Sequence, residues 1–256
     1  MDKAIALFES SLEVYTREAY PEDWAMTTGN LAVAYNNRLS GSKADNVDKA
    51  IALHESLLEV YTREAYPEDW AATMMNLAAA YSVCLSGSKA DNGDKAIALF
   101  ESSLEVYTRE EYPEYWAQTT GNLATAYNNR LSGSKADNKD KAIALHESSL
   151  EVYTREAYLE KWAQNKMGLA NAYSDRLSGS KADNVDKAIA LFESSLEVRT
   201  REAYPEDWAM TTMNLAAAYS DRLSGSKADN LDKAVAFYQS SLEVFTREAY
   251  PEKWAQ

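Results

Sequence analysis

The stretch "WAMTTGNLAVAYNN" (24–37) decides the fold, because its apolar residues recur in steps of three and four. The apolar or semi-apolar positions of the stretch are Trp24, Thr28, Leu31 and Tyr35, and Leu39, which lies just outside the stretch, continues the series. Such spacing is typical of one buried stripe on an amphipathic helix and not of a strand. Pro21 suits the first helical position, and Gly41 in "SGSKADN" (40–46) suits a helix end. The pattern predicts a helix from Pro21 to about Leu39, which we call the A helix.

The segment "VDKAIALHESLLEVYTREAY" (47–66) predicts a second helix, which we call the B helix. Asn46 is a plausible N-cap for it. Its apolar stripe consists of Ile51, His54, Leu58 and Tyr61, widened by Leu53 and Val60. A stripe of this width indicates contact with neighbours on more than one side, as in a stacked array of helical hairpins.

The phrase "DKAIAL" fixes the period of the chain. It begins at Asp2, Asp48, Asp94, Asp140 and Asp186, and the variant "DKAVAF" begins at Asp232, always 46 residues further on. The chain therefore divides into repeats 2–47, 48–93, 94–139, 140–185 and 186–231 and a partial repeat 232–256. A fixed period of about 20–50 residues indicates a solenoid, in which each unit buries its apolar face against the next. We expect one repeat array over residues 1–256.

Charge and composition exclude several classes of function. The formal charge is −14, with 26 basic and 40 acidic residues and no basic run, so a nucleic-acid partner is not expected. No apolar run reaches the roughly 18 residues of a spanning helix, and the chain opens without an apolar signal-peptide region. Cys84 is the single cysteine, which excludes a disulfide framework. We expect a cytoplasmic protein without a membrane partner.

The phrases "NLAVAY" and "DKAIALFESSLEVY" resemble the tetratricopeptide repeat (TPR). The matching positions are Leu31, Ala32 and Tyr35 on the A helix and Ala50, Ile51, His54 and Leu58 on the B helix. Leu57 departs from the pattern, which has a small residue there. The usual TPR period is about 34 residues, so each unit here carries about twelve more, divided between the two connections. The chain is more specifically similar to long-period cyanobacterial repeats that are often fused to CHAT domains.

The resemblance implies an all-α fold: a right-handed α-solenoid of antiparallel helix pairs, with eleven helices and the start of a twelfth. It also implies a protein–protein interaction module whose A helices line a concave binding groove. Residues related by 46 positions form a column, which we name by its number in the first repeat. Across the five full repeats, nine columns differ in more than one copy, and five of these nine lie on one A-helix arc of about 120°.

Drift at exposed positions is the alternative explanation of this variation, but it predicts equal scatter at exposed columns such as Lys49 and Glu59, which barely change. We interpret the arc as the face that meets an extended peptide or a partner helix. Methionine adapts to irregular apolar partners, and amides both donate to and accept from a peptide backbone. The candidate peptide-binding residues are Asn30, Asn76, Asn122, Asn214, Met26, Met75, Gln118, Thr125, Asn129, Gln164, Met167, Asn171, Asp175, Met210, Met213 and Asp221.

The asparagines of column 30, broken by Gly168, resemble the asparagine ladder with which some TPR proteins hold a peptide main chain. The alternative role for these asparagines is to tie down a neighbouring helix or a water molecule. The Lys and Arg residues of the family's carboxylate clamp are missing from this face. A ligand recognised through its C-terminal carboxylate is therefore not expected.

No pattern points to catalysis, a cofactor or a metal. His54 and His146 replace the phenylalanine of other copies and lie two repeats apart, too far to share a metal ion at about 8–10 Å per helix layer. Asp45 and Asp48 lack the spacing of a calcium loop, and capping explains them better. Six tryptophans, one per repeat, indicate inter-repeat packing. We expect a protein that is not an enzyme.

A second hypothesis is a structural spacer or a self-assembling scaffold. The last copy stays apolar, with "AVAFYQSSLEVF" at 234–245, where isolated arrays usually carry a polar cap. Two self-similar ends would allow head-to-tail or swapped association. A regulatory arm of an enzyme domain is a third reading, from family analogy alone.

Overall fold

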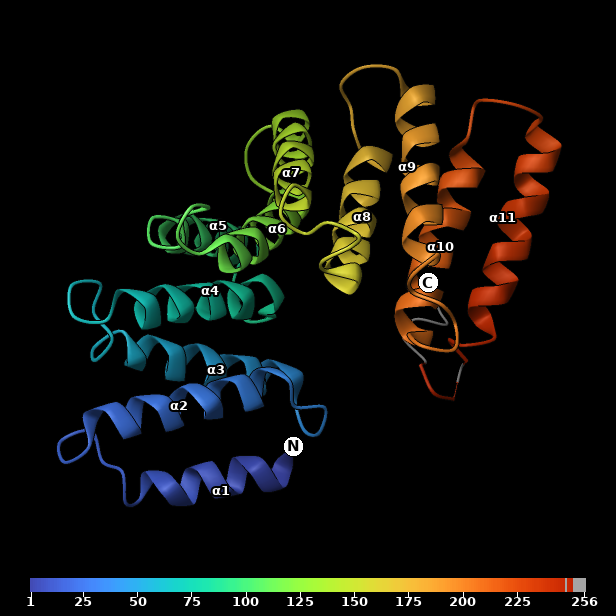
Figure 1. Ribbon diagram of the computed structural model, residues 1–256. Coiled ribbons are helices and arrows are strands. Elements are labelled where there is room, and N and C mark those ends of the chain that lie inside the picture. Colours follow the sequence, from blue (N-terminus) through green and yellow to red (C-terminus); the bar gives the residue numbers. More distant parts are fainter. Residues whose placement is uncertain (247, 251–256) are drawn as a thin grey trace. The chain divides into compact units, whose positions relative to one another are not determined.

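The computed structural model describes residues 1–246 and 248–250, and within them it contains eleven α-helices and no strand (Figure 1). The chain divides into two compact units, Met1–Ser132 and Gly133–Gln256. The first unit holds α1 (Asp2–Leu12), α2 (Pro21–Asn36), α3 (Lys43–Leu57), α4 (Pro67–Val83), α5 (Lys89–Leu104) and α6 (Pro113–Asn129). The second unit holds α7 (Lys135–Leu150), α8 (Leu159–Ser174), α9 (Lys181–Leu196), α10 (Pro205–Asp221) and α11 (Lys227–Leu242).

Within each unit every helix packs against the next one along the chain, and α1 to α4 lie side by side in Figure 1. The even-numbered helices are the A helices, and the odd-numbered helices are the B helices. Consecutive A helices of a unit also contact each other: α2 contacts α4, and α8 contacts α10. The predicted all-α repeat solenoid, built from packed helix pairs, is confirmed.

Small residues let the helices approach closely. Alanine columns 25 and 32 are fully buried in every described copy, and Ala50, Ala96, Ala142 and Ala188 of the B helices are fully buried as well. Leu31 and Ile51 fill the space beside them. Phe100, Phe192, His54 and His146 occupy one B-helix column and are all nearly inaccessible to solvent. The B-helix apolar stripe, on which the sequence places His54, is thus part of the core, and both histidines lie inside it.

The ends of the helices differ from the prediction in four respects. The B helix, predicted to continue to Tyr66, ends at Leu57. The B helix is capped by Ser42, whose Oγ accepts from the Asp45 amide at 3.3 Å, and not by Asn46. Asn46 is buried inside the helix and donates its Nδ2 to the Ser40 carbonyl at 2.9 Å. The A helix ends at Asn36, so Gly41, with φ of 79°, lies in the connection. Leu39, predicted to be buried, is 99% exposed.

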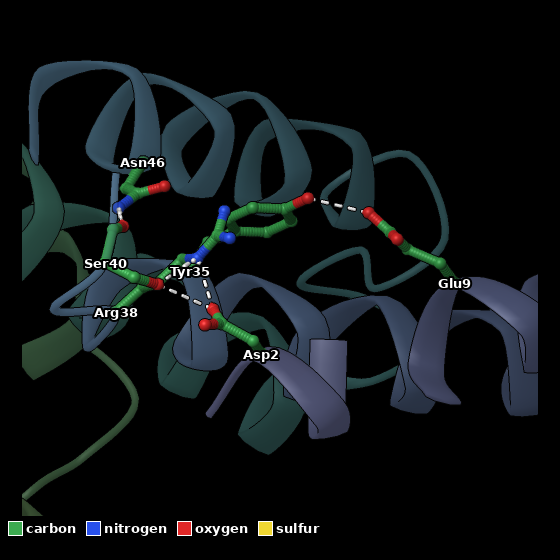
Figure 2. A network of polar contacts seen from close by, with 6 residues as sticks. All are labelled: Asp2, Glu9, Tyr35, Arg38, Ser40 and Asn46. Carbon is green, nitrogen blue, oxygen red and sulfur yellow. Dashed lines mark hydrogen bonds and ion pairs between the residues drawn. The ribbon is translucent and has the colours of Figure 1, made fainter. Parts of the chain in front are cut away.

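A polar junction at each A-to-B connection explains the early helix end (Figure 2). Arg38 Nε and Ser40 Oγ both donate to Asp2 Oδ1 on α1, each at 2.7 Å. These bonds, together with that from Asn46, join three successive helices through one short loop. Hydrogen bonds from Ser40 and Arg38 lower the pKa of the Asp2 carboxyl below its usual value. Sequence patterns did not predict this junction, because its partners lie 36 and 38 residues apart.

The junction recurs with Asp94, Asp140 and Asp186, whose carboxyl pKa values are lowered by the same kind of partners. In the second copy Cys84 takes the place of arginine, and its Sγ lies 3.6 Å from Asp48 Oδ1. Ser86 Oγ still donates to Asp48 at 2.6 Å. Asp48 is therefore an inter-helix acceptor, which corrects the expectation that it caps a helix.

The five tryptophans that the structure describes lie half-buried near the starts of the A helices, each under an arginine of the preceding connection. Arg63 lies 5.5 Å from the centre of the Trp70 ring and pairs with Glu105 of the next repeat at 2.5 Å. Arg17 and Arg201 repeat this arrangement with Trp24 and Trp208. The arginine links each tryptophan to the following repeat, consistent with a packing role. Trp254 and the predicted start of a twelfth helix lie outside the described residues.

Candidate peptide-binding face

The A-helix face is formed by columns 26, 30, 33 and 37, on the side of the helix away from the core. In the first repeat its four residues are exposed: Met26, Asn30 and Val33 on α2, and Asn37 directly after it. The opposite side, including Leu31 and Tyr35, is buried against α1 and α3. Neighbouring helices of the first unit therefore cover the core side of α2 and leave the variable side open.

Column 29 lies deeper than the A-helix face. Met75 is only 7% exposed, and its Sδ accepts from Thr119 Oγ1 of the next A helix at 3.3 Å. The Sδ of Met167 accepts from Thr211 in the same way at 3.2 Å. These two methionines, both predicted to bind peptide, thus lie between successive A helices. Met213, in the same column of α10, is half-buried.

The asparagines of column 30 differ between the two units. In the first unit Asn30 is exposed, and Asn76 and Asn122 are half-buried. None of these three amides makes a hydrogen bond to another described residue, nor is any of them sealed from solvent. In the second unit Asn214 Nδ2 donates to Asn171 Oδ1 of the preceding A helix at 3.1 Å. Asn214 and Asn171 thus tie two helices together.

The break in the asparagine column at Gly168 has a steric cause. A Cβ atom on Gly168 would lie 2.5 Å from Cε1 of His146, because the imidazole fills the space of a side chain. His146 Nδ1 lies 3.1 Å from Asn165 Oδ1. Asn165 Nδ2 in turn donates to the Lys161 carbonyl at 3.1 Å. Asn165 replaces the threonine of other copies, so His146, Asn165 and Gly168 form one matched set.

Burial holds both histidines neutral over most of the pH range. Desolvation lowers the pKa of His54 to about 4 and that of His146 to about 4, although the hydrogen bond to Asn165 opposes the shift at His146. Asn165 donates through its amide nitrogen and accepts through Oδ1, so the proton of neutral His146 resides on Nδ1. Both imidazoles therefore belong to the core and offer no acid–base group at the surface.

The remaining predicted residues lie on the open side of their helices. Thr125 is exposed and donates its hydroxyl to the Gly121 carbonyl one turn back at 3.1 Å, and Asn129 is exposed at the end of α6. In the second unit Gln164 is exposed and Met210 is half-buried, as Gln118 is in the first. The structure therefore keeps these side chains accessible at the A-helix face.

The acidic end of the face is already paired. Asp175 accepts from Lys139 Nζ at 2.7 Å, and Asp221 lies 3.4 Å from Lys181 Nζ. Lys139 is buried, and it stands in a column that is apolar or glycine elsewhere. A lysine in this column, 36 residues before Asp175, is the sequence signal that could have predicted the Lys139–Asp175 ion pair. Asp175 and Asp221 also line a shallow pocket of about 310 Å³ in the second unit, together with Lys135, Arg176, Leu177 and Lys181.

No constellation for metal or membrane chemistry occurs among the residues that the structure describes. They contain no group of three or more His, Cys, Asp or Glu side chains that could hold a metal ion. None of the described helices has the length and apolar character needed to cross a bilayer.

These features define the class: an all-helical repeat protein with an open, variable face on alternate helices. Comparison with known protein families finds no match, and no curated protein matches the chain. Among solved structures, the chain is similar to the crystal structure of BtubC (BKLC) from P. vanneervenii. The TM-score is 0.66 and the identity 21%, over 97% of this chain and 92% of that one. At this identity the likeness supports the helical repeat fold alone.

Proposed function

We propose that the chain is an interaction module of the tetratricopeptide type that binds an extended peptide or a partner helix on its A-helix face. One observation carries this proposal: the three amides of Asn30, Asn76 and Asn122 have no intramolecular hydrogen-bond partner among the described residues, although they recur at one position of three consecutive A helices. An amide group that both donates and accepts matches the alternating N–H and C=O groups of a peptide main chain.

The surroundings of the amides favour a main-chain ligand. Met26 and Val33 flank Asn30 with exposed apolar surface, which suits side chains of an extended peptide. The face of the first unit carries no Lys or Arg in columns 26, 30, 33 and 37, so a terminal carboxylate would lack its counter-charge. The module acts in the cytoplasm without catalysis or a cofactor in this proposal. The narrower resemblance to cyanobacterial repeats fused to CHAT domains stays a prediction.

A displayed library of random twelve-residue peptides, selected on the full chain, supplies the probe for a test. Loss of hydrogen bonds in the variant Asn76→Ala/Asn122→Ala should cost about 2 kcal/mol, or about 30-fold in the affinity of a selected peptide measured by fluorescence anisotropy. Ser102→Ala on α5 removes a polar group away from the face and should leave the affinity unchanged. Equal affinity of the asparagine variant and the unchanged chain, with intact helical circular dichroism, would refute the amide contacts.

The second candidate function is a self-assembling scaffold, which the outer face of α11 favours. Leu231, Val235 and Leu242 on α11 are each at least 42% exposed, whereas Val185 and Ile189 at the matching positions of α9 are buried beneath α10. An A helix supplied by another copy would fit this face. Light scattering over a concentration series tests it: assembly should grow with concentration and disappear in Leu231→Ser/Val235→Ser. A concentration-independent mass would exclude it.

A further inference from the structure

One leucine per repeat is exposed on the connection that follows each A helix. These leucines are Leu39, Leu85 and Leu131 in the first unit and Leu177 and Leu223 in the second, and their exposed fractions run from 61% to 99%. Because the A helices of a unit run in the same direction, the connections that follow them lie along one edge of that unit. We call Leu39, Leu85 and Leu131 of the first unit the leucine edge.

The polar junction turns these leucines toward solvent. Arg130 and Ser132 both donate to Asp94 Oδ1, at 2.8 and 2.6 Å, so both side chains point inward. The backbone is extended at Arg130, with φ of −61° and ψ of 130°. Side chains alternate sides along an extended chain, so Leu131 between them points outward. Arg38 and Ser40 hold Leu39 outward in the same way.

The outward geometry requires no apolar residue at this position, because any polar side chain would fit there without loss of packing. Yet all five copies carry leucine, and the whole connection "LSGSKADN" is identical in each. The columns of the A-helix arc have diverged between copies, whereas this connection has kept its leucine at an exposed position. Apolar surface that is exposed and recurs along one edge, as at these three leucines of the first unit, indicates an interface, in contrast to single scattered apolar residues.

Charges beside the leucine edge indicate what kind of partner fits. Lys43, Asp45, Lys89 and Asp91 follow Leu39 and Leu85 closely and are all exposed. Within the part of the chain that the structure describes, none of these four side chains has an ion-pair partner. The first two connections of the leucine edge thus each present one ammonium and one carboxylate without an ion-pair partner beside a leucine. The edge is locally neutral on a chain with a net charge of −14, so two copies can meet there without strong repulsion.

We propose that the leucine edge pairs with the same edge of a second copy of this chain, in a two-fold arrangement. A two-fold interface needs a self-complementary patch. A two-fold axis between the first two connections supplies one when the two edges run antiparallel. Leu39 then faces Leu85 of the second copy, Lys43 faces Asp91 and Lys89 faces Asp45, and Leu131 lies beside this pair. This surface differs from the A-helix face and from the outer face of α11, and the inference does not depend on peptide binding.

Sedimentation of the full chain up to about 1 mM tests the pairing. We expect a monomer–dimer equilibrium, and an at least tenfold higher dissociation constant for Leu39→Ser/Leu85→Ser/Leu131→Ser. Leu7→Ser on α1, at an exposed leucine outside the edge, is the matched control, and Val235→Ser on α11 tests the array end. Both should dimerise like the unchanged chain.

Charge exchange tests the proposed register. Lys43→Glu/Lys89→Glu and Asp45→Lys/Asp91→Lys should each weaken dimerisation, because like charges then face one another. An equimolar mixture of the two variants should regain the dimer as a heterodimer. A chain that stays monomeric throughout would overturn the proposal, as would a dimer lost in Val235→Ser and kept in the triple leucine variant. Monomers that float with phosphatidylcholine vesicles, unless the leucines are replaced, would also overturn it and assign the edge to a lipid surface.

Discussion

At the scale of single residues, Gly168 demonstrates how tightly one position can depend on another helix. The His146 ring lies 2.5 Å from the place of a Cβ atom on Gly168, and His146 is buried. The ring must move in Gly168→Ala, and displacement of a packed ring usually costs about 1–3 kcal/mol. We expect the free energy of unfolding to fall by that amount in urea titrations followed by circular dichroism.

Gly93→Ala is the control for that experiment, because Gly93 lies inside α5 with nothing within 4 Å of its missing Cβ. Alanine there should stabilise the chain by about 0.5–1 kcal/mol, since glycine is a poor helix former. If the two substitutions shift the urea midpoint equally and in the same direction, the contact between His146 and Gly168 does not exist in solution.

The buried histidines predict a second residue-scale effect, on acid stability. His54 has a pKa of about 4 when folded, against an ordinary value near 6.5 when unfolded. The unfolded chain therefore binds the proton first, and this share of stability is complete above pH 6.5 and is lost as pH falls toward 4. In His54→Phe, about 3 kcal/mol of the pH-dependent loss should disappear.

Urea titrations at several pH values between 6.5 and 4 measure this effect as a slope, which is independent of any constant change in packing. Phenylalanine occupies the same column at Phe8, Phe100 and Phe192, so the fold accepts its ring there. His146 should still titrate in the variant and leave a residual slope. An undiminished slope would mean that His54 is accessible to protons in the folded chain.

At the scale of elements, the polar junction offers a comparison that the chain itself contains. Arg130 pairs with Asp94 at 2.8 Å, whereas Cys84 offers Asp48 only a distant thiol. Cys84→Arg should restore the ion pair and raise the free energy of unfolding by up to about 1 kcal/mol, a small gain because such pairs are partly exposed. The gain should shrink in high salt.

Cys84→Ser is the matched control, since serine removes the thiol without adding a charge. Urea midpoints of both variants at low and high salt separate the ion pair from the effect of losing the cysteine. A salt-independent gain shared by arginine and serine would show that the thiol itself, and not the missing arginine, weakens this copy.

How far the elements could be predicted depends on where their partners lie. The period, the helix pairs and the A-helix start at Pro21 follow from local spacing and propensity, and the structure has them. The A-helix end could not be predicted, because Arg38 and Ser40 are held by Asp2, more than 35 residues away. Leu39 was assigned to the core because continued helical spacing was the only guide.

The candidate site was predictable only as far as one helix can be judged alone. A helical wheel placed Met26, Asn30 and Val33 on the outer side, and these residues are exposed. It placed Met75 beside them, because nothing in α4 indicates how closely α6 approaches. The gap at Gly168 likewise depends on a ring from α7. How deeply a side chain lies between neighbouring helices depends on how those helices pack, which the sequence of a single helix does not indicate.

At the scale of the whole molecule, the main helix–helix contacts among the described residues run between neighbouring helices and between successive A helices within a unit. Stability in such an array is close to a sum of repeat terms and neighbour terms. Successive repeats make equivalent contacts with one another, such as those of Arg63 with Glu105, Arg201 with Glu243 and Tyr66 with Glu22. The number of repeats in the array can therefore change without loss of the architecture.

Deletion of residues 48–93 tests this property directly. It joins Val47 to Asp94, so the start of α3 continues into α5 and the B-helix frame "ADNVDKAIALF" found at 182–192 is kept. Tyr127 of α6 and Arg130, which directly follows α6, then meet Glu101 and Asp94 as before. Because the urea m-value scales with the surface exposed on unfolding, it should fall by about 18%, the share 46/256 that the deleted residues make of the chain. Ellipticity per residue should stay constant.

Deletion of 48–70, half a period, is the control: it joins Val47 to the interior of α4 and should unfold the first unit, because a B helix would continue as an A helix on the wrong side of α2. If the full-period deletion also lost its helical signal, the repeats would depend on contacts beyond their neighbours, and the additive description of the array would be wrong.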